Sequence, residues 1–155
     1  MDRRQVLKLL GAGAGVVLGG QAIAEERAPE AAAGHPDDRG LAACADACGK
    51  CLRECESCST HCAGLLAAGK REHAATLRLC LDCADLCTAA LRLVSRRGPL
   101  MEAICETCAR ACDLCAAECG KFPGERSLEA CAAACRTCAA ACREMLRGHG
   151  PEVGH

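Results

Sequence analysis

Eighteen of the 155 residues are cysteines, the residue type in this chain that is best suited to chemistry. A cysteine thiolate is a nucleophile and a ligand for soft metal ions, and a buried thiol packs as a small apolar group. Six cysteines fall in residues 44–62, CADACGKCLRECESCSTHC, at spacings of four, three, four, three and four residues. Such spacings place side chains on one face of an α-helix. The sequence therefore predicts a continuous line of sulfur along one helix.

The other cysteines repeat this arrangement in three later segments, with neighbours again three or four residues apart. At about 100° per residue, the first six sulfurs fall within a stripe about 80° wide that runs about 27 Å along its helix. The opposite face of this segment carries polar residues such as Asp46 and Arg53. The cysteines predicted to bind metal are Cys44, Cys48, Cys51, Cys55, Cys58, Cys62, Cys80, Cys83, Cys87, Cys105, Cys108, Cys112, Cys115, Cys119, Cys131, Cys135, Cys138 and Cys142.

Glycine and proline separate the four segments. The breaks lie at Gly69, at Gly98-Pro99 and in residues 120–124, and glycine past a helix end with proline soon after stops a helix for steric reasons. Short connections force neighbouring helices to run antiparallel. The sequence therefore predicts an all-α fold, an antiparallel up-down-up-down four-helix bundle with a cysteine-lined core. The expected helices span residues 41–68, 70–97, 100–119 and 126–147.

The composition excludes several classes of function. Lys and Arg number 19 against 20 Asp and Glu, so there is no excess of basic residues for binding nucleic acid. Phe122 is the single residue among Phe, Tyr and Trp, which leaves no stacking platform for bases or sugars. A thiol enzyme needs one activated cysteine beside a positioned base, and no such constellation stands out here. We therefore expect a binding protein without enzymatic activity.

Three kinds of interior are compatible with so many inward cysteines: apolar packing, disulfides and bound metal. A core of small thiols with few large side chains would pack poorly. Disulfides join Cα atoms about 4.4–6.8 Å apart, whereas facing helices lie about 8–10 Å apart. Thiols at i, i+3 and i, i+4, in contrast, can share one metal ion without bending the helix. We therefore favour a core that holds metal.

The charge of the metal narrows its identity. Four thiolates around one Zn²⁺ leave two negative charges, which need cationic partners when buried. The inward stripes contain no Lys or Arg. A soft monovalent ion bound at about one per thiolate leaves a neutral interior, and Cu(I) is such an ion. Multiple Cu(I) ions are thus the expected cargo, and the alternative is a zinc or mixed-metal, metallothionein-like detoxification protein.

Four other residues stay in phase with the cysteines of their segments. Met101, Met145 and His149 gather at one end of the expected bundle, and His73 faces inward at the other. Thioether and imidazole bind Cu(I) more weakly than thiolate, which suits transient capture and transfer. These four residues are therefore candidate metal ligands, or alternatively residues that close the ends of the core or, for His149, belong to the tail.

The second segment departs from the pattern. It carries three cysteines, and Leu91 and Val94 continue its inward face, which predicts an apolar plug at that end. Leu79, Leu86 and Leu93 form a second stripe on the same helix. This stripe either packs against a neighbouring helix or forms a contact between subunits.

The start of the chain has the features of a targeting segment. In residues 1–24, two arginines precede a mildly apolar run, and Ala22-Ile23-Ala24 matches a cleavage site, as in a twin-arginine signal peptide. The run is about 12 residues long, short of the roughly 20 that span a bilayer, so no stable membrane anchor is expected. Residues 25–40 are expected to form a flexible leader and residues 148–155 a C-terminal tail. The signal predicts export to the periplasm.

Four antiparallel helices with these cysteine spacings, behind a twin-arginine leader, resemble the exported branch of the bacterial copper storage proteins. This family consists of cysteine-rich four-helix bundles, and the resemblance covers roughly residues 41–147. It implies storage of many Cu(I) ions by the inward cysteines, with copper entering at one end of the bundle. It also implies a copper donor or acceptor and a homo-oligomer, often a tetramer. A cytosolic branch also exists, and the leader is what favours the exported one.

Overall fold

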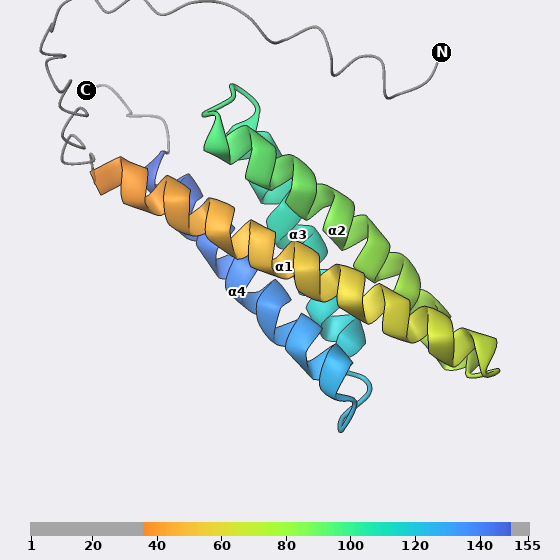
Figure 1. Ribbon diagram of the computed structural model, residues 1–155. Coiled ribbons are helices and arrows are strands. Elements are labelled where there is room, and N and C mark those ends of the chain that lie inside the picture. Colours follow the sequence, from red (N-terminus) through yellow and green to blue (C-terminus); the bar gives the residue numbers. More distant parts are fainter. Residues whose placement is uncertain (1–35, 150–155) are drawn as a thin grey trace, which may run out of the picture. The chain divides into compact units, whose positions relative to one another are not determined.

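The computed structural model describes residues 36–149, and the long elements in this range are all α-helices. Successive helices run in opposite directions, so the predicted all-α, four-helix fold is confirmed (Figure 1). A short 3₁₀ turn, η2, precedes the second helix. The elements are α1 (Pro36–Ala67), η2 (Arg71–His73), α2 (Ala74–Ser95), α3 (Met101–Cys119) and α4 (Arg126–Gly148).

The four helices pack around a square in chain order. α1 packs against α2 and α4, and α3 packs against the same two neighbours. Helices α1 and α3 therefore face each other across one diagonal, and α2 and α4 across the other. This arrangement leaves a common axis between the helices, towards which each cysteine stripe points.

The turns form where the sequence predicted breaks. Gly69 ends α1 with φ +85°, a left-handed conformation that glycine adopts without a Cβ clash. Its N–H donates to the Leu66 carbonyl at 2.9 Å. After α2, Arg97 takes φ 51°, and the Gly98 N–H donates to the Leu93 carbonyl at 2.8 Å. These backbone hydrogen bonds satisfy the last carbonyls of each helix and keep the connections short.

The observed start of α1 corrects one predicted boundary. The helix begins at Pro36, five residues before the expected start at residue 41, so residues 36–40 are helical and do not belong to a leader. Proline suits a first helical turn, because its fixed φ is helical and the N–H that it lacks would have no partner there. The predicted signal peptide, the rest of the leader and residues 150–155 of the tail lie outside the described residues.

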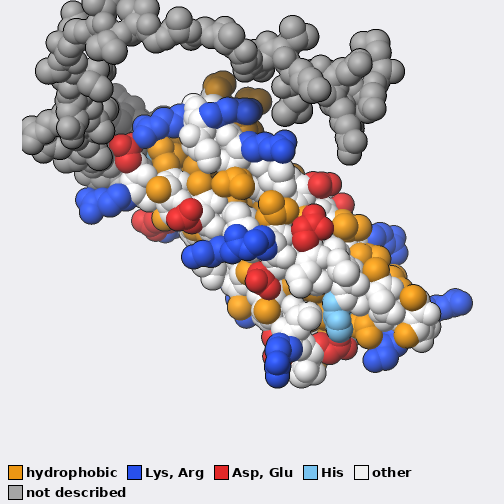
Figure 2. All heavy atoms as spheres, viewed as in Figure 1, with side chains coloured by type: hydrophobic (Ala, Val, Ile, Leu, Met, Phe, Trp, Pro, Cys, Tyr) orange, Lys and Arg blue, Asp and Glu red, His pale blue; other side chains and the backbone are white. Residues whose placement is uncertain are grey.

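The core consists of small side chains. Cysteine and alanine fill most of it, and its large apolar members are Leu41, Val94, Leu128 and Met145. Within residues 38–149, no Lys, Arg, Asp or Glu side chain is buried. Figure 2 shows acidic and basic side chains interspersed over one face, with hydrophobic side chains between them. No helix in the described range combines the length and apolar character needed to span a membrane.

Candidate metal centre

The eighteen cysteines all lie inside the bundle. Each side chain is 1% exposed or less. The predicted inward orientation of the four stripes is therefore confirmed. Alanines such as Ala84, Ala109 and Ala139 are also buried and let the helices approach closely. The interior is thus a column of sulfur surrounded by small apolar groups.

Sixteen of the sulfurs, those of all cysteines except Cys58 and Cys62, form a connected network with separations of 3.6–4.0 Å. Contacts cross both diagonals of the square. Cys51 Sγ lies 3.8 Å from Cys112 Sγ on the opposite helix, and Cys80 Sγ lies 3.9 Å from Cys131 Sγ. Sulfur from all four helices therefore meets at the axis.

All eighteen cysteines are free thiols. An S–S bond is about 2.05 Å long, so separations of 3.6 Å and more are non-bonded contacts. The disulfide interpretation of the interior therefore does not describe this structure. Free, mutually contacting thiols are the form of cysteine that can accept a soft metal ion once deprotonated.

The thiols fall into groups of four whose sulfurs lie within 4.8 Å of one another and could hold a metal ion. One group joins Cys51, Cys83, Cys87 and Cys112, and a second joins Cys51, Cys55, Cys83 and Cys135. The two groups share Cys51 and Cys83. Such sharing recurs along the axis, so the interior is a series of overlapping sites and not a few isolated ones.

Hydrogen bonding shifts the pKa values of these thiols in either direction, whereas burial raises them. Hydrogen bonds from Cys112 and Cys135 lower the pKa of Cys51, because S–H donors stabilise its thiolate. Its neighbour Cys55 has a raised pKa, with Cys115 and Cys131 as the main causes. Burial is the main cause of the raised pKa of Cys62. Part of the metal-free network therefore stays protonated, and metal binding must release those protons.

The two ends of the column differ. The end where α1 begins and α4 finishes is apolar. Met145 is 1% exposed, and Leu41 and Val94 are buried and line a common surface hollow. Met101 and Leu91 are partly buried against the same core. The predicted apolar plug at this end is confirmed for Val94. His149 is half-buried, and its Nδ1 lies 3.1 Å from the Met145 carbonyl oxygen.

The opposite end buries polar side chains beside the apolar Leu128, which is 0% exposed. His73 is 2% exposed, and its Nδ1 and the buried Thr76 hydroxyl have no hydrogen-bond partner. His73 Nε2 lies 3.4 Å from Glu125 Oε1, and the Phe122 ring stacks on the imidazole at 4.3 Å between centroids. The other oxygen of Glu125 lies 3.2 Å from His61 Nε2. A carboxylate that holds one nitrogen of a histidine fixes its orientation and leaves the second nitrogen for a ligand.

Sequence reasoning missed Glu125, Phe122 and the part played by His61. His61 lies off the cysteine stripe and its side chain is 40% exposed, so helical spacing gave it no role. Glu125 follows His61 by 64 residues and reaches it across the bundle end. No local pattern marks that contact. His73, in contrast, precedes Cys80 by seven residues, about two helical turns, and this spacing correctly placed it inside the bundle.

Four-helix packing around a column of reduced thiols defines a metal-binding bundle, and the sequence profile of the copper storage protein family matches residues 37–147. This match covers more than half of the chain. The chain belongs to the copper storage protein family. An uncharacterized cysteine-rich protein of Bacillus subtilis, YhjQ, is 39% identical over 80 residues, which cover 51% of this chain and 71% of that protein.

Solved structures of copper storage proteins share the fold. The Cu(I)-bound copper storage protein BsCsp3 is 38% identical, with a TM-score of 0.63, over 68% of this chain and 97% of its own. A cytosolic copper storage protein from Streptomyces lividans, described with five coppers, is 32% identical, with a TM-score of 0.68, over 74% and 98% of the two chains. The Streptomyces protein has also been solved loaded with 10 copper equivalents, with a TM-score of 0.67, 32% identity, and coverage of 74% and 89%.

These relatives correct the predicted localisation. The Streptomyces lividans protein is described as cytosolic, which points away from the exported, periplasmic protein that residues 1–24 suggested. The prediction of a periplasmic protein was therefore wrong.

Proposed function

We propose that this chain stores multiple Cu(I) ions, about one per thiolate, on the eighteen cysteines of its interior. The observation that carries the proposal is the continuous network of buried thiols in overlapping groups of four. Relatives described as Cu(I)-bound and as loaded with 10 copper equivalents support it. The ions are cargo that the protein takes up and gives back.

Charge favours Cu(I) over Zn²⁺ as that cargo. None of the buried side chains within residues 36–149 belongs to Lys or Arg. Zn²⁺ held by four thiolates would therefore leave buried negative charge without a compensating cation. One Cu(I) per thiolate makes the interior neutral. The rival candidate is a zinc or mixed-metal detoxification protein, which would saturate at four or five Zn²⁺, about one per four cysteines.

The residues at the ends of the column are proposed as auxiliary ligands. His73 offers a buried Nδ1 without a hydrogen-bond partner. Met145 offers a buried thioether, and Met101 and His149 are partly buried at the same end. Thioether and imidazole bind more weakly than thiolate. These four residues would therefore hold the outermost ions, which leave first.

The proposal includes no catalytic role. The thiols are equivalent in burial, and none stands apart with a base of its own. Copper would be exchanged with a donor or acceptor. On the family resemblance, we also propose that copies of the chain assemble, as a tetramer. Light scattering of the purified protein tests the assembly, and a monomer would contradict it.

Anaerobic titration of the reduced full chain with Cu(I), in the presence of a competing chromogenic chelator, tests the storage proposal. We expect uptake of about 18 ions per chain, one for each thiolate, with little change in helix content by circular dichroism. A parallel titration with Zn²⁺ separates the rival candidate. Saturation by four or five Zn²⁺ together with failure to outcompete the Cu(I) chelator would overturn copper storage.

A further inference from the structure

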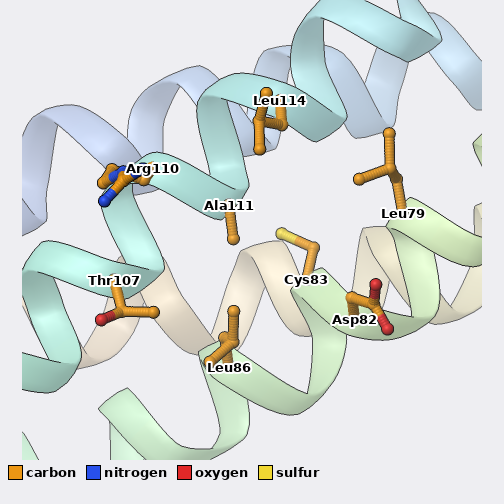
Figure 3. A pocket seen from close by; sticks show the side chains of 8 residues that line it. All are labelled: Leu79, Asp82, Cys83, Leu86, Thr107, Arg110, Ala111 and Leu114. Carbon is orange, nitrogen blue, oxygen red and sulfur yellow. The ribbon is translucent and has the colours of Figure 1, made fainter.

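A surface groove between α2 and α3 has a storage thiol in its floor (Figure 3). The groove encloses about 370 Å³, within the range of small-molecule sites. Leu79 and Leu86 on α2 and Leu114 on α3 form its apolar walls, and Ala111 is small enough to leave the space open. The side chain of Cys83 lies between the two helices and points towards Ala111.

Cys83 belongs to the groove and to the metal column at once. Its sulfur lies 3.6 Å from Cys112 Sγ and is a member of two overlapping four-thiol groups. Cys83 is fully buried, so the leucine walls cover its sulfur. Leu114 is 61% exposed, and exposed side chains change rotamer within picoseconds to nanoseconds. A small movement of the groove walls would therefore open a lateral path to the middle of the column.

The rim of the groove carries one charge of each sign. Asp82 on α2 and Arg110 on α3 lie on opposite sides of the cavity. Neither forms an ion pair with another residue in the described part of the chain. An apolar slot between an unpaired carboxylate and an unpaired guanidinium is complementary to a small molecule with an ammonium group, a carboxylate and a soft apolar centre.

A second groove of similar size lacks these features. It lies between α1 and α4 and encloses about 320 Å³. Alanines and Thr137 line it with Lys50, Arg53 and Glu54, and no cysteine does. Ala134 in this groove directly precedes a core cysteine, as Ala111 does in the first. The α1–α4 groove therefore provides a matched internal control.

We propose that the α2–α3 groove binds a small thiol with an ammonium and a carboxylate group, and that this thiol takes Cu(I) from Cys83 by ligand exchange. The inference rests on the proposed storage of Cu(I) and adds a lateral route of release. The sulfur of the incoming thiol forms a bond to copper, and the bond from copper to Cys83 Sγ breaks. A second molecule of the thiol displaces the other core thiolate of that ion in the same way, and the proton of each incoming thiol moves to the core sulfur that it displaces. Copper remains Cu(I), so no oxidant or reductant is needed.

The test uses the full chain loaded anaerobically with Cu(I) and an excess of disulfonated bathocuproine, a bulky Cu(I) chelator. Formation of the coloured chelate is followed with and without L-cysteine, and with 2-mercaptoethanol as an uncharged thiol. We expect L-cysteine to speed transfer about tenfold or more, because a bound and oriented reactant exchanges far faster than a free one. 2-Mercaptoethanol should give a smaller acceleration. An oligomer that covers the groove would remove the acceleration by L-cysteine and overturn the proposal.

Variants locate the exchange. Ala111→Leu fills the groove and Leu114→Trp covers it, and both should remove the acceleration by L-cysteine. Leu114→Trp alters an exposed position and keeps the test possible if Ala111→Leu does not fold. Arg110→Gln should lower the effect of L-cysteine to that of 2-mercaptoethanol. Ala134→Leu, the matched control in the α1–α4 groove, should behave as the parent chain does.

Two results separate this inference from the storage proposal. Copper per chain is measured before each reaction. If the parent takes up few ions, storage itself is wrong. If all variants load fully and Ala111→Leu and Leu114→Trp keep the full acceleration, exchange occurs at the bundle ends and only the groove proposal is overturned.

Discussion

The two ends of the bundle are closed by different chemistry. Leu41, Val94 and Met145 close one end with apolar side chains. His73 and Thr76 occupy the other and bury polar atoms without hydrogen-bond partners. Apolar burial stabilises the fold by about 25 cal/mol per Å², whereas an unpaired buried polar atom costs about 1–3 kcal/mol. The side chains at the apolar end therefore stabilise the fold. The polar end keeps buried polar groups that lower its stability.

The largest effect is expected at the apolar end. Met145→Ala leaves a cavity in the core, and we expect the metal-free chain to lose about 2–5 kcal/mol of unfolding free energy. Urea denaturation under reducing, anaerobic conditions measures the loss. Met145→Leu preserves volume and should cost less than about 1.5 kcal/mol.

Copper analysis of Met145→Leu sharpens the same comparison. If Met145 acts chiefly as a plug, the variant binds as much Cu(I) as the parent. Loss of one ion per chain would instead identify Met145 as a ligand and make the two ends more alike than their burial indicates.

At the polar end, a substitution is expected to raise the unfolding free energy instead of lowering it. Thr76→Val removes the unpaired hydroxyl and keeps the shape of the side chain, and we expect the metal-free chain to gain about 1 kcal/mol. The control is Thr137→Val, because the Thr137 hydroxyl is exposed and donates to the Ala133 carbonyl at 3.1 Å. That variant should change stability by less than about 0.5 kcal/mol. Destabilisation by Thr76→Val would show that the hydroxyl has a favourable partner.

Alkaline pH should weaken the metal-free bundle at the polar end. Burial raises the pKa of Cys62 above its usual value of 9.0. A raised pKa means that the folded chain binds the proton more tightly than the unfolded chain does, so the contribution of Cys62 is complete below pH 9.0 and is lost as pH rises through the raised value.

Denaturation midpoints of the metal-free chain at pH 8 and above pH 9 measure this dependence. Cys62→Ala should reduce the loss of stability at high pH. The copper-loaded chain should also lose less stability at high pH, because its bound thiolates no longer titrate. A midpoint that rises with pH would contradict the assigned direction.

The smallest effects are expected from exposed ion pairs, and one pair from each end serves for the comparison. Lys121 pairs with Glu118 near the polar end, and Arg97 pairs with Asp38 near the apolar end. Lys121→Gln and Arg97→Gln should each change the unfolding free energy by less than about 1 kcal/mol, because solvent and salt screen exposed pairs. A larger loss at one end would mean that surface charge, and not the core, separates the two ends.

Helical periodicity made most of the fold and the sulfur column predictable. Cysteines three and four residues apart can share one direction only on a helix, and the glycines at 69 and 98 mark where two of those helices stop. The start of α1 was less predictable, because Pro36 and the residues after it combine helix-start and linker features.

Features that depend on three-dimensional packing could not be predicted from the sequence. His61 and Glu125 meet because the end of α1 lies beside the start of α4. No residue spacing within one segment predicts this contact. The α2–α3 groove depends on a small side chain, Ala111, facing Cys83 on another helix. The localisation prediction was wrong for a different reason, since it rested on a short arginine motif, whereas the Streptomyces lividans relative is described as cytosolic.

Because neighbouring four-thiol groups share cysteines, an ion could pass from one group to the next without leaving all of its ligands. An ion that hops from the group around Cys87 and Cys112 to the group around Cys55 and Cys135 keeps Cys51 and Cys83 as ligands throughout. It never becomes a bare cation in an apolar medium, which is the state that would impose a high barrier. Cu(I) held by these groups would therefore be able to move between neighbouring groups that share thiols by exchanging part of its ligands at a time.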